Sequence, residues 1–247
     1  SAPQTEGHIA ADGKSPSIWD TFAAAGHLAE GHTLDPGCDS YTRYEEDFDL
    51  LKDLGLAHYR TSIQWTRILP EGRGRVNQAG IDYYHRVIDA LLDRDITPWI
   101  NLYHFDLPQT LEDEYGGWMN RQVIDDFGAY AQVVADAYGD KIQNWITINE
   151  PWCLSVGYGL GMHAPGRKLS DQQAMQAIHH GLVAHGTAVR VLRSTSGQDS
   201  RIGLVHNPKV SCPAWESEDN IQAARDWFEY ESGPILHALL KGGYPSS

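Results

Sequence analysis

Short buried runs alternate with amphipathic helical segments along most of this sequence, and this alternation restricts the fold more than any other feature. Four runs are rich in apolar, β-branched and aromatic residues and lack a clean two-residue alternation, which is typical of strands covered on both faces. These predicted strands span residues 59–65, 97–105, 144–149 and 201–207. Residues 1–5 are interpreted as the remnant of an earlier strand.

Helical patterns separate the predicted strands, because apolar residues recur there every three or four positions. The four apolar faces are Tyr44, Phe48 and Leu51; Ile81, Tyr84, Ile88 and Leu91; Val123, Phe127, Tyr130 and Val134; and Ala174, Ile178, Leu182, His185 and Val189. Asn77 and Ser170 are the predicted N-caps of the second and fourth helices. Alternating strands and helices indicate βαβ units on a parallel sheet, either doubly wound or closed into a barrel.

Polar residues mark the ends of the predicted strands. Gln64, His104, Asn149, Glu150 and Asn207 each lie at or just after the carboxyl end of a strand. Barrel enzymes build their active sites at that face. No G-x-G-x-x-G segment follows a strand, as a dinucleotide-binding sheet would require. The sequence therefore favours a barrel with a site at this edge.

The number of strands sets the extent of that barrel. A complete eight-stranded barrel takes about 250 residues, yet this chain of 247 residues contains only four clear strands and one remnant. We expect an α/β fold that forms the N-terminal part of a (β/α)8 TIM barrel, about strands 1–5 with their helices, while strands 6–8 lie outside the chain. No linker or low-complexity tract interrupts residues 1–247, which we interpret as a single domain.

Glu150 is the strongest candidate for catalytic chemistry. It follows Asn149, whose amide can hydrogen-bond a sugar hydroxyl, and it precedes Pro151, which stiffens the backbone after the strand. Burial beside aromatic residues such as Trp145 and Trp152 would raise the pKa of Glu150 by desolvation, as a general acid near neutral pH requires. A surface or salt-bridged glutamate is the alternative, and the spacing alone does not decide between them.

The segment Thr147-Ile148-Asn149-Glu150-Pro151-Trp152 resembles the acid/base signature of the family 1 glycoside hydrolases, the β-glucosidase and β-galactosidase group. Residues 16–22, 59–65, 102–108 and 163–166 also resemble segments of this family and occur in the family's order. The resemblance extends from Gln4 to Pro245. It implies a retaining mechanism on a TIM barrel in which Glu150 is the catalytic acid/base.

The resemblance also implies roles for residues around Glu150. Gln4, His104 and Asn149 correspond to residues that bind the sugar hydroxyls in the −1 subsite. Arg60 corresponds to an arginine that lies against the nucleophilic carboxylate and keeps it ionised. Arg60 and Asn149 are therefore expected to join Glu150 in the catalytic group.

Two further residues extend the expected site. Trp152 corresponds to part of the wall on the aglycone side, because an aromatic face suits the apolar face of a sugar ring or an aryl leaving group. Asn207 corresponds to an asparagine on strand five near the acid/base. Core packing for Trp152 and a plain salt bridge for Arg60 are the alternative interpretations.

Some positions depart from the family pattern. Phe105 stands where the family usually has a tryptophan that contacts the glycone, so the aromatic surface is kept and the N–H donor is lost. The other departures are Ser40 and Thr42, where histidines are common, Gln64 in place of a serine, and Thr5 and His8 near Gln4. The family's nucleophile lies in an Ile-Thr-Glu-Asn-Gly segment on strand seven, and this sequence contains no such segment.

These features predict a retaining β-glucosidase that hydrolyses terminal β-D-glucosyl residues by double displacement. Its expected substrate is a β-glucoside or a short β-linked oligosaccharide. We expect this chain to carry the acid/base half of the site and to be active only when a C-terminal barrel fragment, separate or continuous, completes it. A sugar-binding half-barrel without catalytic activity and a 6-phospho-β-glycosidase are the alternatives.

Charge and cysteine spacing argue against several other classes of protein. Nineteen basic against 33 acidic residues give a net charge of −14, which disfavours binding to nucleic acid. No run approaches the roughly 20 apolar residues of a membrane helix, so no membrane association is expected. Cys38, Cys153 and Cys212 are widely spaced and form no C-x-x-C pair, which indicates a reducing, cytoplasmic location.

Three histidines share one predicted helix and raise the question of a metal. His179, His180 and His185 lack the H-E-x-x-H pattern, and a five-residue spacing is poor for two ligands on a helix. We therefore predict structural roles for them, with no metal and no cofactor.

Overall fold

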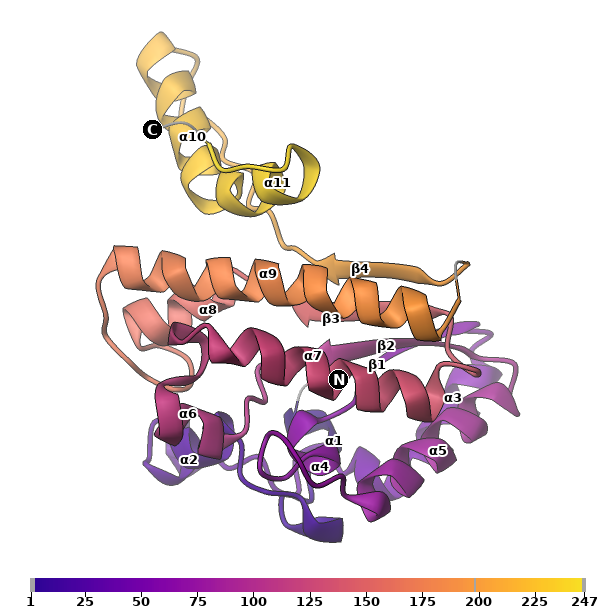
Figure 1. Ribbon diagram of the computed structural model, residues 1–247. Helices are drawn as coiled ribbons and strands as arrows, with labels where there is room; N and C mark the ends of the chain where they lie inside the picture. Colours follow the sequence, from indigo (N-terminus) through magenta and orange to yellow (C-terminus); the bar gives the residue numbers. More distant parts are fainter. Residues whose placement is uncertain (1–2, 198, 246–247) are drawn as a thin grey trace.

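A parallel four-stranded sheet lies at the centre of the computed structural model, which describes residues 3–197 and 199–245 (Figure 1). The strands are β1 (His58–Ser62), β2 (Thr97–Tyr103), β3 (Asn144–Asn149) and β4 (Arg201–Val205), and they pair in chain order. All four predicted strands are thus confirmed. Three of them end earlier than predicted, because the chain turns into loops or a short helix right after Ser62, Tyr103 and Val205.

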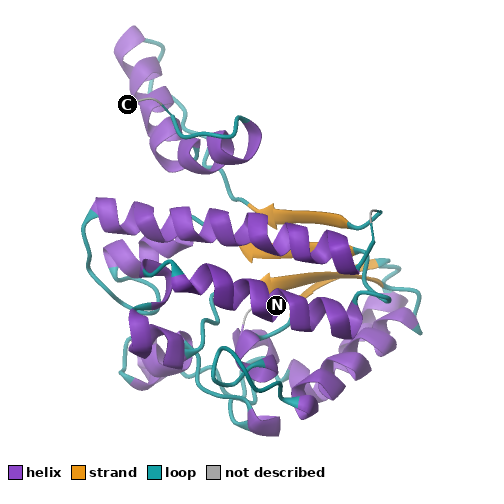
Figure 2. Cartoon of the chain, in the orientation of Figure 1, coloured by secondary structure: helices purple, strands orange, loops and turns teal. Residues whose placement is uncertain are grey.

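Each strand is joined to the next by helices. The elements ahead of β1 are α1 (Pro3–Glu6), η1 (Ala11–Gly13), α2 (Ile18–Ala24), η2 (Ala29–Gly31) and α3 (Ser40–Asp53). The crossovers contain α4 (Trp65–Ile68) and α5 (Gln78–Leu92), then α6 (Gln109–Tyr115), η3 (Gly117–Met119) and α7 (Gln122–Tyr138), then α8 (Cys153–Ser155), η4 (Val156–Leu160) and α9 (Asp171–Thr195). Helices α10 (Glu218–Glu231) and α11 (Gly233–Leu240) follow β4 and were not predicted. Figure 2 shows how helix and strand alternate.

The four predicted helical faces became α3, α5, α7 and α9. Ser170 caps α9 as predicted, because its hydroxyl accepts from the Gln173 N–H and Gln173 reaches back to the Ser170 backbone. Asn77 stands at the N-cap position of α5 without capping it. Its side-chain amide instead donates to the carbonyl oxygens of Asp12 and Arg67, at 2.7 and 2.9 Å, and so joins α5 to the N-terminal segment.

The predicted N-terminal strand remnant is wrong for the residues that the structure describes. Pro3–Glu6 is a short helix, while Ser1 and Ala2 lie outside the described residues. The carbonyl oxygen of Pro3 accepts from the Gly7 N–H at 3.0 Å, and that of Gln4 accepts from the Cys38 N–H at 2.9 Å. These carbonyl groups bond a local turn and the Cys38 loop instead of a neighbouring strand.

A buried ion pair anchors this N-terminal segment. Arg67 is fully buried, its guanidinium lies 2.6 Å from the Glu6 carboxylate, and it also donates to the backbone carbonyl of Ala11 at 2.9 Å. The second carboxylate oxygen of Glu6 accepts from the Tyr84 hydroxyl at 2.6 Å. Burial is the largest single effect and lowers the Arg67 pKa, but the charge and hydrogen bond of Glu6 together with the neighbouring Tyr84 and Tyr83 raise it overall.

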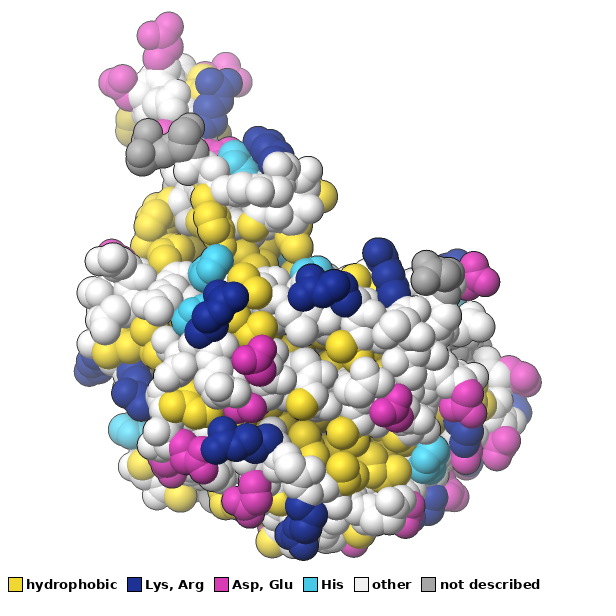
Figure 3. Space-filling view, in the orientation of Figure 1, with side chains coloured by type: hydrophobic (Ala, Val, Ile, Leu, Met, Phe, Trp, Pro, Cys, Tyr) yellow, Lys and Arg dark blue, Asp and Glu magenta, His cyan; other side chains and the backbone are white. Residues whose placement is uncertain are grey.

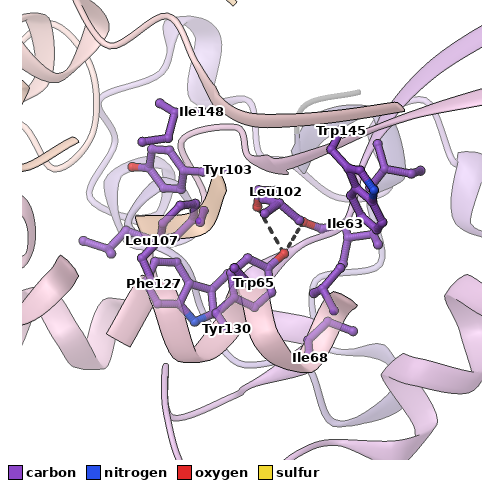
Figure 4. Packing of buried hydrophobic residues seen from close by; sticks show 14 of the residues in the cluster. Ile63, Trp65, Ile68, Leu102, Tyr103, Leu107, Phe127, Tyr130, Trp145 and Ile148 are labelled. Carbon is purple, nitrogen blue, oxygen red and sulfur yellow. Dashed lines mark hydrogen bonds between the residues drawn. The ribbon is translucent and has the colours of Figure 1, made fainter. Parts of the chain in front are cut away.

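Aromatic side chains fill the core between the sheet and the helices (Figure 4). Trp65 and Tyr130 stack with ring centroids 5.0 Å apart. The Tyr130 hydroxyl lies 2.8 Å from the carbonyl oxygen of Ile63 and 3.1 Å from that of Leu102. Helix α7 is thereby bonded to the carboxyl ends of β1 and β2.

Helices α7 and α9 lie side by side against the sheet, and α10 and α11 extend beyond β4 (Figure 1). Apolar side chains gather on the surface where α10 and α11 approach α9 (Figure 3). No helix among the described residues combines the length and apolar character needed to cross a lipid bilayer.

We expect Arg67→Ala to lower the free energy of unfolding by about 3–5 kcal/mol, because it leaves the Glu6 carboxylate buried without its cation. Urea denaturation of the variant measures this loss. Arg43→Ala is the matched control, since Arg43 pairs with Glu46 on the exposed surface of α3 and its removal should change stability little. Equal losses in the two variants would contradict the anchoring role of Arg67.

Candidate active site

The carboxyl ends of the four strands meet at one edge of the sheet and bring the predicted polar residues into one region. His104 follows β2, Glu150 follows β3 and Asn207 comes two residues after β4. Arg60 lies within β1, and its guanidinium donates to the side-chain oxygen of Asn149 at the end of β3. Two residues that are 89 positions apart in sequence are thereby joined across the sheet.

Arg60 is held in a partly buried position. Burial lowers its pKa, and the nearby Glu150 carboxylate opposes that shift. The Nε atom of Arg60 is buried and has no hydrogen-bond partner among the described residues. An unpaired buried N–H is costly, and this one can donate to an acceptor group that approaches it.

Glu150 occupies an unusual backbone position. Its φ is 46°, in the left-handed region that residues with a side chain rarely adopt. Its amide donates to the carbonyl oxygen of Val205 at 2.8 Å, where the pairing of β3 and β4 is shifted. The side chain is half-buried, and its Oε2 accepts a hydrogen bond from the Cys153 thiol at 3.3 Å. Strain of this kind often marks a functional site.

Asp106 organises the backbone beside the ends of β1 and β2. Its carboxylate is fully buried and accepts from the Trp65 N–H at 2.7 Å and the His104 N–H at 3.1 Å. Burial raises the pKa of Asp106, and these backbone donors oppose part of that shift. The resulting pKa is about 6. The ring of His104 lies 3.3 Å from the Ser62 hydroxyl, so Asp106 and Ser62 together fix its place.

Aromatic rings line the same edge. Phe105 has a φ of 72° and lies beside the rings of Tyr103, His104 and His163, with centroid distances of 6.3, 5.1 and 6.3 Å. Trp152 is half-buried and makes an edge contact with Tyr230 of α10 at 5.6 Å.

In the described structure, two predicted residues make no hydrogen bond to this group. The side chains of Gln4, on α1, and Asn207, after β4, are exposed. Among the residues that the structure describes, neither side chain hydrogen-bonds to Arg60, Asn149 or Glu150. Gln64 is buried, at 2% exposure, and its amide has no partner among the described residues.

Several residues near Glu150 were not predicted from the sequence. His163 and His206 lie close enough for the Glu150 charge to act on them, although burial is the larger effect and lowers the pKa of both rings. Cys153 and Asp106 were missed as well. Cys153 stands three positions after Glu150, but the contact depends on the left-handed turn at Glu150, which the sequence does not reveal.

The three histidines of α9 make separate contacts. The Nδ1 atom of His180 lies 2.8 Å from the Trp118 carbonyl oxygen, and that of His185 lies 2.7 Å from the Thr147 hydroxyl. His179 contacts the Tyr244 hydroxyl at 2.6 Å. Within residues 3–197 and 199–245, no group of three or more His, Cys, Asp or Glu side chains is arranged to hold a metal ion.

The chain matches a known family and known β-glucosidases along its length. The model of the family described as "Glycosyl hydrolase family 1" matches residues 1–247. The chain is 45% identical to Beta-glucosidase A of Thermotoga maritima over 245 residues, which is 98% of this chain and 54% of that protein. It is 44% identical to Beta-glucosidase A of Acetivibrio thermocellus, covering 100% of this chain and 55% of the relative.

Solved structures agree with the sequence matches. The β-glucosidase from Thermotoga maritima in complex with deoxynojirimycin superposes with a TM-score of 0.95 at 43% identity, covering 99% of this chain and 56% of that chain. The complex of the same enzyme with glucoimidazole also gives 0.95. The chain spans about half the length of the curated relatives it matches. Its parallel sheet and helices are therefore part of a TIM barrel, which confirms the predicted fold class.

We expect the contribution of Asp106 to stability to fall as the pH rises. The native pKa of about 6 lies above the ordinary value of 3.8, so the folded protein holds this proton more tightly than the unfolded chain. Between about pH 4 and pH 7 the free energy of unfolding should therefore decrease by about 2 kcal/mol through this group. Asp106→Asn removes that dependence, which urea denaturation across this pH range measures.

Asp113→Asn is the control for this prediction, because Asp113 is an exposed carboxylate on α6. Its variant should keep the pH dependence of the original protein. If the free energy of unfolding changed with pH in the same way for the original protein and Asp106→Asn, the raised pKa of Asp106 would be contradicted.

Proposed function

The chain belongs to glycosyl hydrolase family 1, and on this premise we propose that it is the N-terminal half of a retaining β-glucosidase barrel with Glu150 as the acid/base. The observation that carries the proposal is the position of Glu150 at the end of β3, beside Asn149 and its hydrogen bond to Arg60. Relatives named as β-glucosidases support glucosides as the substrate class. A Thermotoga maritima relative binds deoxynojirimycin and glucoimidazole, which supports a site for a glucose-sized ring.

The remaining residues take their proposed roles from their positions around Glu150. Asn149 and His104 bind the hydroxyls of the sugar in the −1 subsite, with Gln4 completing this set from the N-terminal segment. Phe105 supplies an apolar surface for the sugar. Trp152 and Asn207 lie toward the aglycone, and the contact of Trp152 with Tyr230 fits a wall that continues onto α10.

Hydrolysis then follows two displacements. In the first, a carboxylate attacks the anomeric carbon while Glu150 gives its proton to the glycosidic oxygen, which leaves with the bonding electrons. In the second, Glu150 takes a proton from water, and the resulting hydroxyl oxygen displaces the carboxylate from the anomeric carbon. The two carboxyl groups lie about 5 Å apart in such enzymes.

The attacking carboxylate is proposed to come from a C-terminal barrel segment, continuous with this chain or separate from it. The sequence contains no Ile-Thr-Glu-Asn-Gly segment, and the chain spans about half of its relatives. The buried Nε of Arg60 fits this arrangement, since it can donate to a carboxylate that approaches from outside the described residues.

Glu150→Gln in the complete protein should reduce kcat/KM by about 10²-fold or more for an alkyl β-glucoside, whose leaving group needs a proton. For a dinitrophenyl β-glucoside, which leaves without protonation, the expected loss is about tenfold or less. Initial rates with both substrates measure the difference. Equal losses on the two substrates would remove Glu150 from the acid role.

The 247-residue chain expressed alone should not turn over an aryl β-glucoside, whereas the complete protein should. Intact mass and denaturing electrophoresis establish which polypeptides are present in each sample, and substrate without protein gives the background rate. Turnover by the isolated chain would contradict the proposal that the nucleophile lies elsewhere. Light scattering that showed a homodimer of this chain, together with calorimetry that showed glucose binding without turnover of the aryl β-glucoside, would favour the sugar-binding half-barrel.

A 6-phospho-β-glycosidase is the alternative enzyme, because Glu150 could protonate the leaving group of a glucoside or of a 6-phosphoglucoside. Comparing kcat/KM of the complete protein for a β-glucoside and its 6-phosphate separates the two.

A further inference from the structure

Cys153 makes two contacts with the candidate acid/base. Its thiol donates to Glu150 Oε2 at 3.3 Å, and its backbone N–H donates to the Glu150 carbonyl oxygen at 2.9 Å. Cys153 begins α8, so the turn that follows the strained Glu150 backbone returns a side chain directly onto the carboxylate. The contact is therefore built into the local fold.

The other side of the Cys153 side chain faces apolar groups. It lines a small cavity together with Tyr103, Phe105, Leu154 and Tyr158. Burial, followed by the hydrogen bond and charge of Glu150, raises the pKa of the thiol to about 12. The sulfur consequently keeps its proton over the range in which a glycosidase works and remains a hydrogen-bond donor.

Charged and titratable groups from other elements also face Glu150. Arg60 approaches from β1, His163 from the loop ahead of α9, and His206 from the loop after β4. Lys209 carries a charge nearby and pairs with Glu231 at 2.7 Å. Among these groups, Cys153 is the one with a hydrogen bond to a carboxylate oxygen of Glu150 in the described structure.

We propose that Cys153 is a positioning residue for Glu150. The Cys153 thiol donates a hydrogen bond to Oε2 of Glu150, and Oε1 is left to exchange the proton with the substrate. The proposal rests on the acid/base role proposed for Glu150. A carboxyl group can carry its proton on either oxygen, and only the oxygen facing the glycosidic bond can deliver it. A donor fixed on Oε2 selects Oε1 for the proton and restricts rotation of the carboxyl group.

Loss of this donor has a predictable effect on the titration of Glu150. A hydrogen bond to a carboxylate favours the ionised form, so its removal raises the pKa of the carboxyl group. The first displacement needs protonated Glu150, and the basic limb of the pH dependence of kcat/KM therefore reports its pKa in the free enzyme. That limb should move to higher pH when the donor is removed.

The test uses the complete protein with Cys153→Val, which keeps a similar volume without a donor, and Cys153→Ser, which keeps a donor. With an alkyl β-glucoside, the basic limb of Cys153→Val should move up by about half a pH unit or more, while that of Cys153→Ser stays in place or moves down. Cys212→Val, which alters an exposed cysteine, is the control and should leave the limb unchanged.

A limb that stays unmoved in Cys153→Val would overturn the proposal, and an equal loss of kcat in both variants beside it is the result that a packing role predicts. Thermal unfolding checks that each variant is folded, and Cys153→Ala replaces Cys153→Val if the latter does not fold. The Glu150→Gln variant distinguishes failure of the Cys153 proposal from failure of the acid/base role proposed for Glu150. A basic limb that persists in Glu150→Gln rejects the role of Glu150; a limb that disappears there but does not move in Cys153→Val rejects Cys153 alone.

Discussion

Parallel pairing of four consecutive strands is the constraint on which the rest of this structure depends. Because β1 to β4 run in one direction and pair in chain order, the loop that follows each strand lies at the same edge of the sheet. The register then brings side chains together that are far apart in sequence, such as Arg60 and Asn149. Helices α7 and α9 bury one another and the sheet, so the packing that stabilises the strands also aligns the candidate site.

Buried charged side chains fix the position of backbone segments near the candidate site, and their desolvation lowers the stability of the fold. The Asp106 carboxylate holds the backbone of Trp65 and His104 together, while its raised pKa records the free energy spent on desolvation. Glu6 and Arg67 form a second buried pair that ties the N-terminal segment to α4. In other proteins, replacing a buried ion pair by apolar side chains of similar volume often leaves stability unchanged or raises it. These buried charged groups provide a defined position for the loop that carries His104 and for the short helix α1 that carries Gln4.

Glu150 combines backbone strain with a specific electrostatic surrounding. Its left-handed φ turns the chain sharply from β3 into α8, and that turn places the Cys153 thiol on its carboxylate. The charge of Glu150 opposes the lowering of the Arg60 pKa by burial, whereas burial holds the half-buried rings of His163 and His206 toward their neutral forms. A carboxyl group that both donates and accepts a proton must stay within hydrogen-bond reach of the reacting oxygen, so a fixed position suits the role proposed for Glu150.

The sequence alone determined the four strands, the four principal helices and the strand-end position of Glu150, since these follow from local periodicity and chain order. It also carried the family resemblance, which the family match confirms. It did not determine the helix at Pro3–Glu6, the exposure of Gln4 and Asn207, or the contacts of Asp106 and Cys153. Those depend on which backbone and side-chain groups meet across loops, a matter of three-dimensional packing that periodicity does not encode. Only the tertiary structure therefore decided which polar groups surround Glu150, because hydrogen bonds and desolvation act through space and not along the chain.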